Sequence, residues 1–433
     1  MKVVVVGGGP AGMSAARVAA EAGADVVLVD SERALGGQYH RGDPQHVTVR
    51  HLPESTVWVV EPGPRLHIRT GPADSPHRTG TVLDADALVL ATGAHDRVVP
   101  FPGWDLPGVY TAGAAQALAK EHGVAVGRRV VISGTGPFLL PVAESLIRVG
   151  AKVTEILEAN SGAGWFRAPR ALLAGRAKAG ELAGYLALLA GQRIPLRRRA
   201  AVIAAHGTDH VSSVTTARLD ANWNVVPGTE RRRDVDAVCV GHGFTPRLDL
   251  AVAAGCRIVN GFVDVDAAQR TSVPGVYAAG EITGIGGAVL SSAEGEVAGA
   301  AAAGASRPPH AALKAVRDGR RFADGLAAAH PIRPGWQGWL RPDTLVCRCE
   351  EVSHEALCAA VDRGASGVRT LKLASRCGLG LCQGRICGRN AIDIAEARLE
   401  RHFFDDAAMS RRPIATPIRL GELAQPTEEH PHD

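Results

Sequence analysis

A glycine-rich turn between two apolar runs near the N-terminus constrains the fold of this chain more than any other feature. Residues 3–6 are all valine and residues 26–29 are apolar, so both are expected to be buried strands. Three glycines between them have the spacing G-x-G-x-x-G: Gly7, Gly9 and Gly12. Such glycines allow a tight turn, close approach of the backbone to a pyrophosphate, and close helix packing. Asp30 follows the second strand, where an acid binds the adenosine ribose, so the segment predicts a dinucleotide-binding unit.

Two later strand ends favour FAD over NAD as this dinucleotide. An apolar strand over residues 87–91 and another before residue 280 each end in a short turn. Both turns would bring backbone close to the pyrophosphate and ribityl chain of FAD, for which a simple NAD dehydrogenase has no need. The positive N-terminal end of the Ala-rich helix expected over residues 288–303 would face the flavin ring and stabilise the reduced flavin. From these turns and this helix start, the expected cofactor contacts are Thr92, Gly93, Gly280, Glu281, Gly287 and Ala288.

A second strand–turn–helix pattern lies between residues 129 and 158. Gly134 and Gly136 repeat the first two glycine positions, but Leu139 occupies the third and should push the helix away from the strand. Glu158 ends the next strand, where its carboxylate would accept an adenosine ribose and repel the extra phosphate of NADP. Two hypotheses stay open: a second nucleotide of some kind binds here, or the fold is a remnant with a structural role only.

Six of the eight cysteines lie between residues 347 and 387, far more than an even spread would give. In a reducing compartment such a cluster indicates a metal or redox site before it indicates disulfides. Four thiolates suit a [2Fe–2S] cluster or zinc. The spacings Cys-x-Cys and Cys-x4-Cys favour the iron–sulfur cluster, because a zinc ribbon more usually has two Cys-x-x-Cys pairs. The candidate ligands are Cys347, Cys349, Cys382 and Cys387.

The residues around these cysteines extend the prediction. Three glycines form a loop whose N–H groups are expected to donate to sulfur: Gly378, Gly380 and Gly384. Three arginines add positive charge, which would raise the reduction potential of a cluster: Arg348, Arg376 and Arg385. Cys377 is either a neighbour of the ligands or a spare ligand. The other cysteines are expected in the apolar core: Cys239, Cys256 and Cys358.

Composition and sequence patterns exclude several other classes of protein. Apolar residues make up 46% and charged residues 21%, as in ordinary globular proteins, and the net charge of +4 gives no nucleic-acid footprint. No apolar run approaches ~18 residues, so no membrane span is expected. The N-terminal valines run into glycines and lack a signal peptide's pattern, so the expected location is the cytoplasm. A flavin disulfide reductase needs a cysteine pair beside the flavin, but residues 36–40 are Gly-Gly-Gln-Tyr-His, so that activity is rejected.

Six stretches spread along the chain share a pattern with one known group. They are residues 36–38, 91–94, 100–109, 111–113, 134–143 and 382–387. The Phe-Pro-Gly-Trp sequence at 101–104 and the Cys-Gln-Gly-Arg sequence at 382–385 are specific to that group. On these residues the chain resembles the larger accessory (alpha) subunits of bacterial multi-subunit amino-acid and opine dehydrogenases. The group includes the opine oxidases, D-hydroxyproline dehydrogenase alpha subunits and the hydrogen cyanide synthase B subunit. The chain is also similar to the flavin-binding half of the sarcosine oxidase alpha subunit.

The resemblance implies two Rossmann-like domains of the glutathione or thioredoxin reductase kind, followed by a domain like bacterioferritin-associated ferredoxin. It implies that the residues above, with Gly37 and Gln38, hold FAD, and that the four cysteines hold the cluster. It further implies a separate beta subunit that carries its own FAD and oxidises the amine, and it allows a small ferredoxin-like subunit. Leu139 is usual in the family and argues against NAD(P)H as an obligatory donor. The region between Gln38 and Thr56 is shorter than the family usually has.

We therefore expect an α/β chain divided into an FAD-binding domain, a second dinucleotide-binding domain, a linker helix with a Pro/Trp arm, a [2Fe–2S] domain and a tail. The expected ranges, in that order, are 1–125 with 255–305, 126–254, 306–342, 343–400 and 401–433. The expected function is electron transfer from the partner's amine oxidation through flavin and cluster to a further acceptor. Two alternatives stay open: a stand-alone NADH-dependent flavin reductase that reduces its own cluster, and a non-catalytic scaffold that binds zinc.

Overall fold

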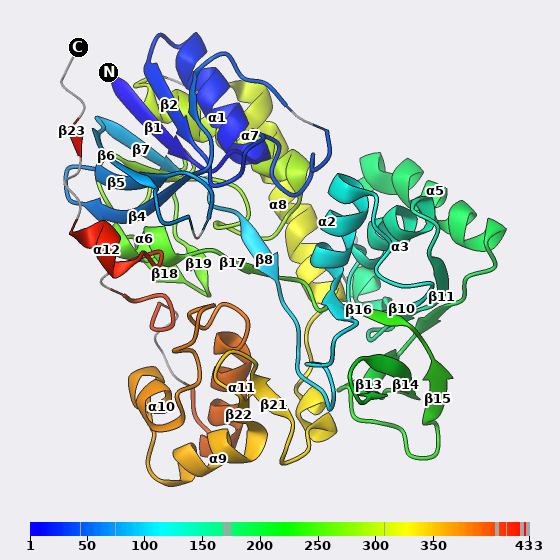
Figure 1. Cartoon of the computed structure of the whole chain (residues 1–433). Coiled ribbons are helices and arrows are strands. Elements are labelled where there is room, and N and C mark those ends of the chain that lie inside the picture. Colours follow the sequence, from blue (N-terminus) through cyan, green and yellow to red (C-terminus); the bar gives the residue numbers. More distant parts are fainter. Residues whose placement is uncertain are drawn as a thin grey trace. The chain divides into compact units, whose positions relative to one another are not determined.

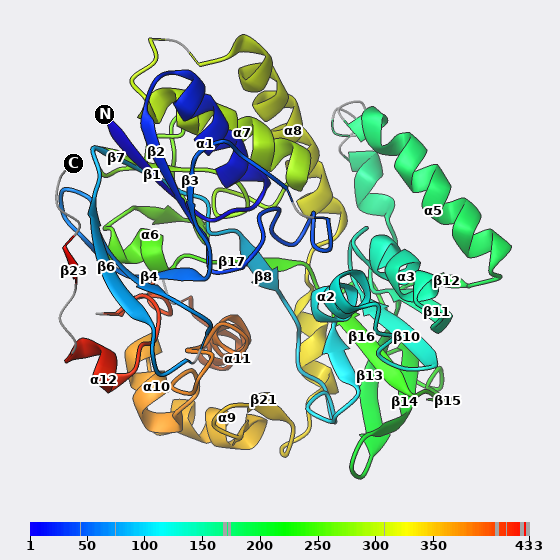
Figure 2. The ribbon, with the colours of Figure 1, turned by 45° about the horizontal axis from the view of Figure 1, so that its top comes forward.

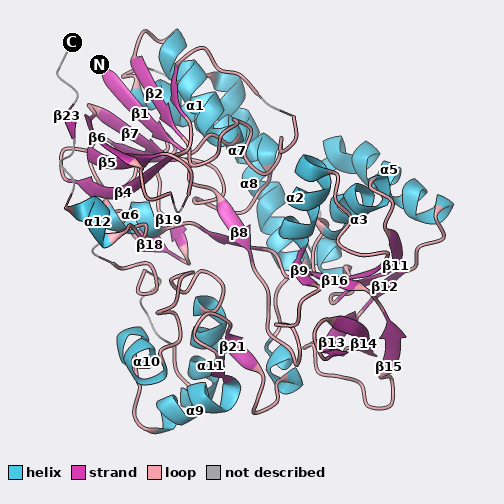
Figure 3. Cartoon of the chain, in the orientation of Figure 1, coloured by secondary structure: helices cyan, strands magenta, loops and turns pink. Residues whose placement is uncertain are grey.

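The computed structural model describes residues 1–433 apart from 44, 74, 168–170, 172–174, 307, 403–406, 413, 425–427 and 430–433. Its contacts divide the chain into two compact units. The first unit contains residues 1–94, 246–323 and 406–433, and the second contains residues 95–245 and 324–405. Each unit is built on a parallel sheet with helices on one face (Figures 1 and 3), which confirms the predicted α/β class.

The first unit has a sheet of five parallel strands in the order β20-β7-β1-β2-β3. The strands are β1 (Lys2–Val6), β2 (Asp25–Val29), β3 (Arg50–Leu52), β7 (Ala87–Leu90) and β20 (Val276–Ala278). Alternate valines of β1 face opposite sides of the sheet. Val3 and Val5 pack with helices α1 (Pro10–Glu21) and α7 (Ala288–Ala302), which lie side by side (Figure 2). Val4 and Val6 enter a second core on the other face.

That second face is covered by an antiparallel meander and short helices. The elements on this face are β4 (Ser55–Glu61), β5 (Arg65–Thr70), β6 (Thr79–Asp84), β23 (Glu428–Glu429), α6 (Asp249–Ala253), β18 (Ile258–Val259), β19 (Phe262–Val263) and α12 (Leu420–Leu423). Helix α8 (His310–Ala329) instead lies against α7, where Arg320 pairs with Glu294 (Figure 2). The buried guanidinium of Arg78 donates to the buried carboxylate of Glu422 at 2.7 and 2.8 Å. This ion pair, with the pairing of β23 on β6, makes the described part of the predicted tail from residue 407 on a component of the first unit.

The second unit has a parallel sheet in the order β12-β11-β10-β16-β9. Its strands are β9 (Val109–Thr111), β10 (Arg129–Gly134), β11 (Lys152–Glu158), β12 (Leu196–Arg198) and β16 (Ala237–Gly241). Its helices are α2 (Ala112–His122), α3 (Leu139–Arg148) and α5 (Ala179–Gly191), with 3-10 turns η1 (Ala163–Arg167) and η2 (Gly175–Lys178). Val130 and Ile132 of β10 pack with these helices, whereas Val131 faces the other core.

The other core of the second unit joins the sheet to the cysteine region. It is built from β13 (Ala200–Gly207), β14 (Val211–Arg218), β15 (Arg231–Asp234), η3 (Pro334–Trp339), β21 (Leu345–Cys347), β22 (Val352–Ser353), α9 (His354–Asp362), α10 (Val368–Ser375) and α11 (Gly388–Leu399). A continuous set of buried apolar side chains runs from β13 and β14 through Trp223, Trp336 and Trp339 to Cys347. The cysteine region therefore shares one hydrophobic core with the second dinucleotide fold.

The two units differ from the predicted division at several boundaries. The first segment of the first unit ends at Ala94, where the sequence suggested residue 125, because β9 supplies the edge strand of the second sheet beside β16. Residues 246–254 and the described part of 306–323 lie in the first unit, and residues 343–400 lie in the second. Helix α2, which follows β9, packs in the same core as α3. The chain passes between the units at two short paired strands, β8 (Ala94–Asp96) and β17 (Phe244–Pro246), and within α8. In the described residues no helix is long and apolar enough to cross a membrane.

Candidate functional site

The first glycine turn seats helix α1 directly on the end of β1. Gly7 has φ +112°, and a Cβ atom there would overlap the carbonyl group of Ala91. A Cβ atom on Gly12 would overlap the Gly7 carbonyl oxygen, so only glycine permits this approach of helix to strand. At Gly9, by contrast, no described atom lies within 4 Å of the Cβ position. The turn is tight on its protein side and open at Gly9, which is the shape a pyrophosphate cradle requires.

Four parallel strands of the first unit end at the same edge of the sheet, and the predicted cofactor residues follow these ends. They are Gly7 after β1, Asp30 after β2, Thr92 and Gly93 after β7, and Gly280 and Glu281 after β20. A Cβ on Gly280 would lie 2.8 Å from the Cβ of Ala11, and one on Gly37 would lie 2.9 Å from the Cα of Gly9. Gln38, beside Gly37, is exposed. The structure thus gathers these residues at one place, and their contact with a cofactor stays a prediction.

The acids at this edge accept hydrogen bonds from the turns around them. The buried carboxylate of Asp30 accepts the N–H of Gly8 and, at 2.6 Å, that of Glu32. Burial raises the pKa of Asp30. Glu281 accepts the N–H of Gly287 at 2.7 Å and therefore braces the turn in which Gly287, at φ +85°, starts α7 and places Ala288 at its first position. Each acid is fixed beside the turn that the sequence assigned to the cofactor.

Sequence reasoning missed Glu294, which lies in α7 and is completely buried. Its carboxylate accepts the N–H of Gly280 and the hydroxyl of Thr283, each at 2.9 Å, and pairs with Arg320 at 2.5 Å. Burial raises the pKa of Glu294 to about 7. Through these hydrogen bonds Glu294 holds the turn at Gly280 in place. Its signal in the sequence is an acid inside an Ala-rich helix, followed by Gly295 and Gly299, whose Cβ atoms would overlap the α1 backbone.

The second glycine turn is contacted by side chains of its own unit. Glu158 accepts the hydroxyl of Thr135 at 2.7 Å and the N–H groups of Gly136 and Asn160 at 2.8 and 2.9 Å. His330 Nδ1 lies 3.4 Å from the Glu158 carboxylate. Trp165 donates its indole N–H to His330 Nε2 at 3.2 Å. The carboxylate predicted to receive a ribose is therefore engaged by the protein itself.

Leu139 is accommodated by a later helix start. Helix α1 begins at Pro10, immediately after Gly9, whereas α3 begins at Leu139, with two turn residues after Gly136. The Leu139 side chain is buried among the helices and strands on that face of the sheet. The expected displacement is thus a later helix start: α3 begins two residues further from its glycine turn than α1 does.

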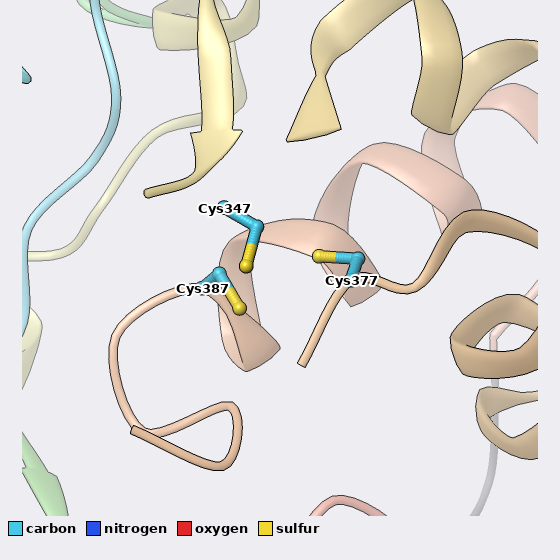
Figure 4. A group of neighbouring side chains, drawn as sticks. All are labelled: Cys347, Cys377 and Cys387. Carbon is cyan, nitrogen blue, oxygen red and sulfur yellow. The ribbon is translucent and has the colours of Figure 1, made fainter. Parts of the chain in front are cut away.

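Three cysteine sulfurs converge in the second unit. The Sγ atoms of Cys347, Cys377 and Cys387 all lie within 4.8 Å of one another, and the three residues are buried. They come from the end of β21, the loop after α10 and the start of α11, and their sulfurs point toward one another (Figure 4). Cys382 contacts Cys387 and Cys349, and Cys349 is exposed. The structure therefore brings the four predicted ligands into one chain of contacts and adds Cys377 to it.

Hydrogen bonds to sulfur come from the predicted loop. The N–H of Gly378 contacts Cys347, and that of Gly384 contacts Cys382, as expected. Gly380 has a different role, because a Cβ atom there would overlap the Cβ of Cys349. The sulfur contacts, that with Cys387 first, lower the pKa of Cys382 to about 5. The loop is thus shaped around thiolate sulfur.

The predicted arginines divide into different roles. Arg376 pairs with Glu350 at 2.7 Å, so its charge is balanced nearby. Arg348 stacks over Trp104 at 5.2 Å and donates to the carbonyl of Asp105. Trp104 in turn donates its indole N–H to the carbonyl of Leu345 at 2.6 Å, which ties the Phe-Pro-Gly-Trp stretch to the strand that carries Cys347. Of the remaining cysteines, Cys239 and Cys256 are buried as expected, and Cys358 is half-buried.

Comparison with known proteins agrees with this architecture. Residues 1–305 match the family of pyridine nucleotide-disulphide oxidoreductases. The chain belongs to this family. It is an oxidoreductase, although no cysteine precedes Cys239, so the cysteine pair that the family's name refers to is absent from its first sheet. The resemblance predicted from the sequence is confirmed by the relatives that the chain matches.

Two curated relatives and one solved structure are informative. The A subunit of opine oxidase from Agrobacterium tumefaciens is 31% identical, with 98% of this chain and 91% of the relative covered. The HcnB subunit of hydrogen cyanide synthase from Pseudomonas aeruginosa is also 31% identical, with 89% and 91% covered. L-Proline dehydrogenase from P. horikoshii has the same fold, with a TM-score of 0.68 at 20% identity over 98% of this chain and 79% of that one.

Proposed function

We propose that the chain is the FAD- and [2Fe–2S]-containing electron-transfer subunit of an amino-acid, imino-acid or opine dehydrogenase complex. The observation that carries this proposal is the convergence of cysteine sulfurs within 4.8 Å in an oxidoreductase whose first unit has a single cysteine, the buried Cys256, and so no cysteine pair. Such a chain has a place for a dinucleotide and a separate thiolate site. That combination suits transfer of electrons better than disulfide reduction.

The fit of FAD rests on the shape of the first turn. The space at Gly9 and the N-terminus of α1 suit the pyrophosphate, and Asp30 suits the ribose hydroxyls. Gly37, Gln38, Thr92, Gly93, Gly280, Glu281, Gly287 and Ala288 are the further residues that we assign to the cofactor. Bound flavin would accept two electrons and release them singly. The protein's part is to fix these turns, for which Glu281 and Glu294 supply the hydrogen bonds.

The fit of the cluster rests on the donor set. Cys347, Cys349, Cys382 and Cys387 supply four thiolates, the ligand number of a [2Fe–2S] cluster. The N–H groups of Gly378 and Gly384 contact the sulfurs of Cys347 and Cys382. Such hydrogen bonds stabilise negative charge on sulfur and so favour the reduced cluster. A bound cluster would carry one electron at a time.

A partner protein is part of the proposal. The relatives are named as subunits, of opine oxidase and of hydrogen cyanide synthase. No site for a substrate carboxylate is assigned in the described residues of this chain. We therefore place amine oxidation on an FAD-containing beta subunit. A small ferredoxin-like subunit is a further component of such a complex.

The alternative of a stand-alone NADH-dependent reductase draws on the second dinucleotide fold. Glu158 ends its second strand, as binding of NADH requires, but its carboxylate is engaged by Thr135, Gly136 and Asn160. Because α3 begins only at Leu139, its N-terminus also lies further along the chain from the glycine turn. These contacts favour a relay subunit over a direct NADH oxidase.

The test is an anaerobic visible spectrum of the full chain before and after NADH, together with iron, zinc and labile-sulfide analysis. Flavin bands, iron and sulfide, with no change on adding NADH, support the proposal. Bleaching of the flavin within the mixing time would instead establish the NADH reductase. Zinc without iron or sulfide would establish the scaffold.

A further inference from the structure

Cys377 is the cysteine that the four-ligand assignment leaves unused, although its sulfur lies among the ligands. Its Sγ atom is within 4.8 Å of those of Cys347 and Cys387. Its side chain is 1% exposed, and Figure 4 shows its sulfur directed at the other two. A thiol in this position is too close to the site to be ordinary core packing.

The backbone around Cys377 fixes this direction. Arg376 ends α10 in the left-handed conformation, at φ +65°, and Gly378 follows at φ +85°. The N–H of Cys377 donates to Ser375 Oγ at 3.1 Å. The left-handed conformations on either side of Cys377 therefore direct its side chain toward the other two sulfurs (Figure 4).

Contacts link the five sulfurs. Cys347, Cys377 and Cys387 all contact one another, and Cys382 contacts Cys387 and Cys349. Two iron atoms need two sulfur pairs, and the four predicted ligands supply them as Cys347 with Cys387 and Cys349 with Cys382. Cys377 is then outside both pairs and contacts both sulfurs of the first.

We propose that Cys377 is a non-ligating thiol that donates its S–H to the ligand sulfurs of Cys347 and Cys387 and so raises the reduction potential of the cluster. This inference rests on the proposed [2Fe–2S] site. An unperturbed thiol is protonated at neutral pH and is a weak donor. Hydrogen bonds to ligand sulfur stabilise the added negative charge of the reduced cluster. Cys377 is thus a positioning and tuning residue, and the four ligands keep their roles.

The experiment compares Cys377→Ala and Cys377→Ser with wild type in the full chain, purified anaerobically. Cys358→Ala, in α9 of the same region, is the matched control. Iron and labile sulfide per chain report whether the cluster is kept, and an electron paramagnetic resonance titration of the reduced cluster reports its midpoint potential. Neither readout depends on catalytic activity.

We expect Cys377→Ala to keep iron and sulfide at the wild-type level and to have a more negative midpoint. At a fixed potential the reduced-to-oxidised ratio should fall roughly two- to tenfold, the equivalent of one hydrogen bond. Cys377→Ser, whose hydroxyl still donates, should fall between, and Cys358→Ala should match wild type.

Two results overturn the inference alone. Loss of iron and sulfide in both Cys377 variants, with a folded chain by circular dichroism, would make Cys377 a ligand. An unchanged midpoint in Cys377→Ala would remove its tuning role. Wild-type chain without iron and sulfide would overturn the proposed cluster itself, and the inference with it, so the two failures are distinguishable.

Discussion

The two glycine turns of this chain begin from one local pattern and end in different surroundings. In the first, α1 begins immediately after Gly9, and Asp30 accepts backbone N–H groups of Gly8 and Glu32. In the second, α3 starts later, and Glu158 accepts the Thr135 hydroxyl as well as backbone N–H groups. His330, from far along the chain, lies 3.4 Å from the Glu158 carboxylate.

The difference teaches that a strand–turn–helix–acid pattern is a scaffold whose use depends on its neighbours. A carboxylate that accepts hydrogen bonds only from its own turn can still accept hydrogen bonds from a ribose. An acid that also holds a hydroxyl and a histidine would have to give these contacts up, at a cost of about 1–3 kcal/mol for a buried group. We therefore expect the first fold to bind its dinucleotide far more strongly than the second.

The largest expected effect is that of Gly12→Ala. The new Cβ would overlap the Gly7 carbonyl oxygen, so helix α1 must move off β1. We expect loss of nearly all bound flavin and about 3 kcal/mol or more of unfolding free energy. Flavin content after gel filtration and urea unfolding are the measurements.

The matched variant is Gly9→Ala. Gly9 has φ −77°, and no described atom lies within 4 Å of its Cβ position, so the apoprotein should unfold as wild type does. Flavin affinity should nevertheless fall at least about tenfold, the equivalent of 1.4 kcal/mol, if the pyrophosphate approaches there. Unchanged affinity would contradict the placement of the pyrophosphate.

Glu294 gives the first unit a stability that falls as pH rises. Burial raises its pKa from 4.5 to about 7, so the folded state prefers the protonated acid. The preference is fully present below pH 4.5 and is lost as pH rises through 7, a change of up to about 3 kcal/mol in unfolding free energy. Release of flavin fluorescence during urea unfolding, from pH 5 to 8, follows this unit. Glu294→Gln should flatten this slope, and an unchanged slope would assign it to another group.

His242 gives the second unit the opposite dependence. This buried histidine follows β16 and accepts the N–H of Val99, and burial lowers its pKa from 6.5 to about 3. Its neutral form contributes stability that is fully present above pH 6.5 and is lost as pH falls, by about 2 kcal/mol at pH 5. Five of the six tryptophans lie in this unit, so intrinsic fluorescence follows its unfolding. His242→Gln should lose less stability than wild type between pH 7 and pH 5, and an unchanged acid sensitivity would refute the assignment.

The smallest effects compare the two acids directly. Asp30→Asn should weaken flavin binding about tenfold, because a charged acceptor for the ribose is lost. Glu158→Gln should leave flavin content unchanged and lower the unfolding free energy of the second unit by about 1–2 kcal/mol. Equilibrium dialysis with FAD and fluorescence-detected unfolding separate the two. Equal loss of flavin in both variants would contradict the assignment of the flavin to the first dinucleotide fold alone.

The sequence by itself determined the class of the fold and the identity of the chemical groups. The spacing of Gly7, Gly9 and Gly12 dictated a turn that only glycine can make, because a Cβ would overlap backbone at two of these positions. The alternation of the valines in β1 placed one core on each side of the sheet. The spacing of the cysteines was enough to indicate a thiolate site. These are local properties, fixed within a few residues.

Only the tertiary structure decided how these local features are used. Residues 95–125 follow the first sheet in sequence, but the edge of the second sheet accepts β9 there. Glu158 and His330 lie in contact. In the same network the side chain of Asn160 donates to the carbonyl of Pro331, 171 residues further along the chain. Cys377 joins Cys347 and Cys387 because the turn after α10 directs it inward. Contacts between distant segments depend on packing, and no local pattern encodes them.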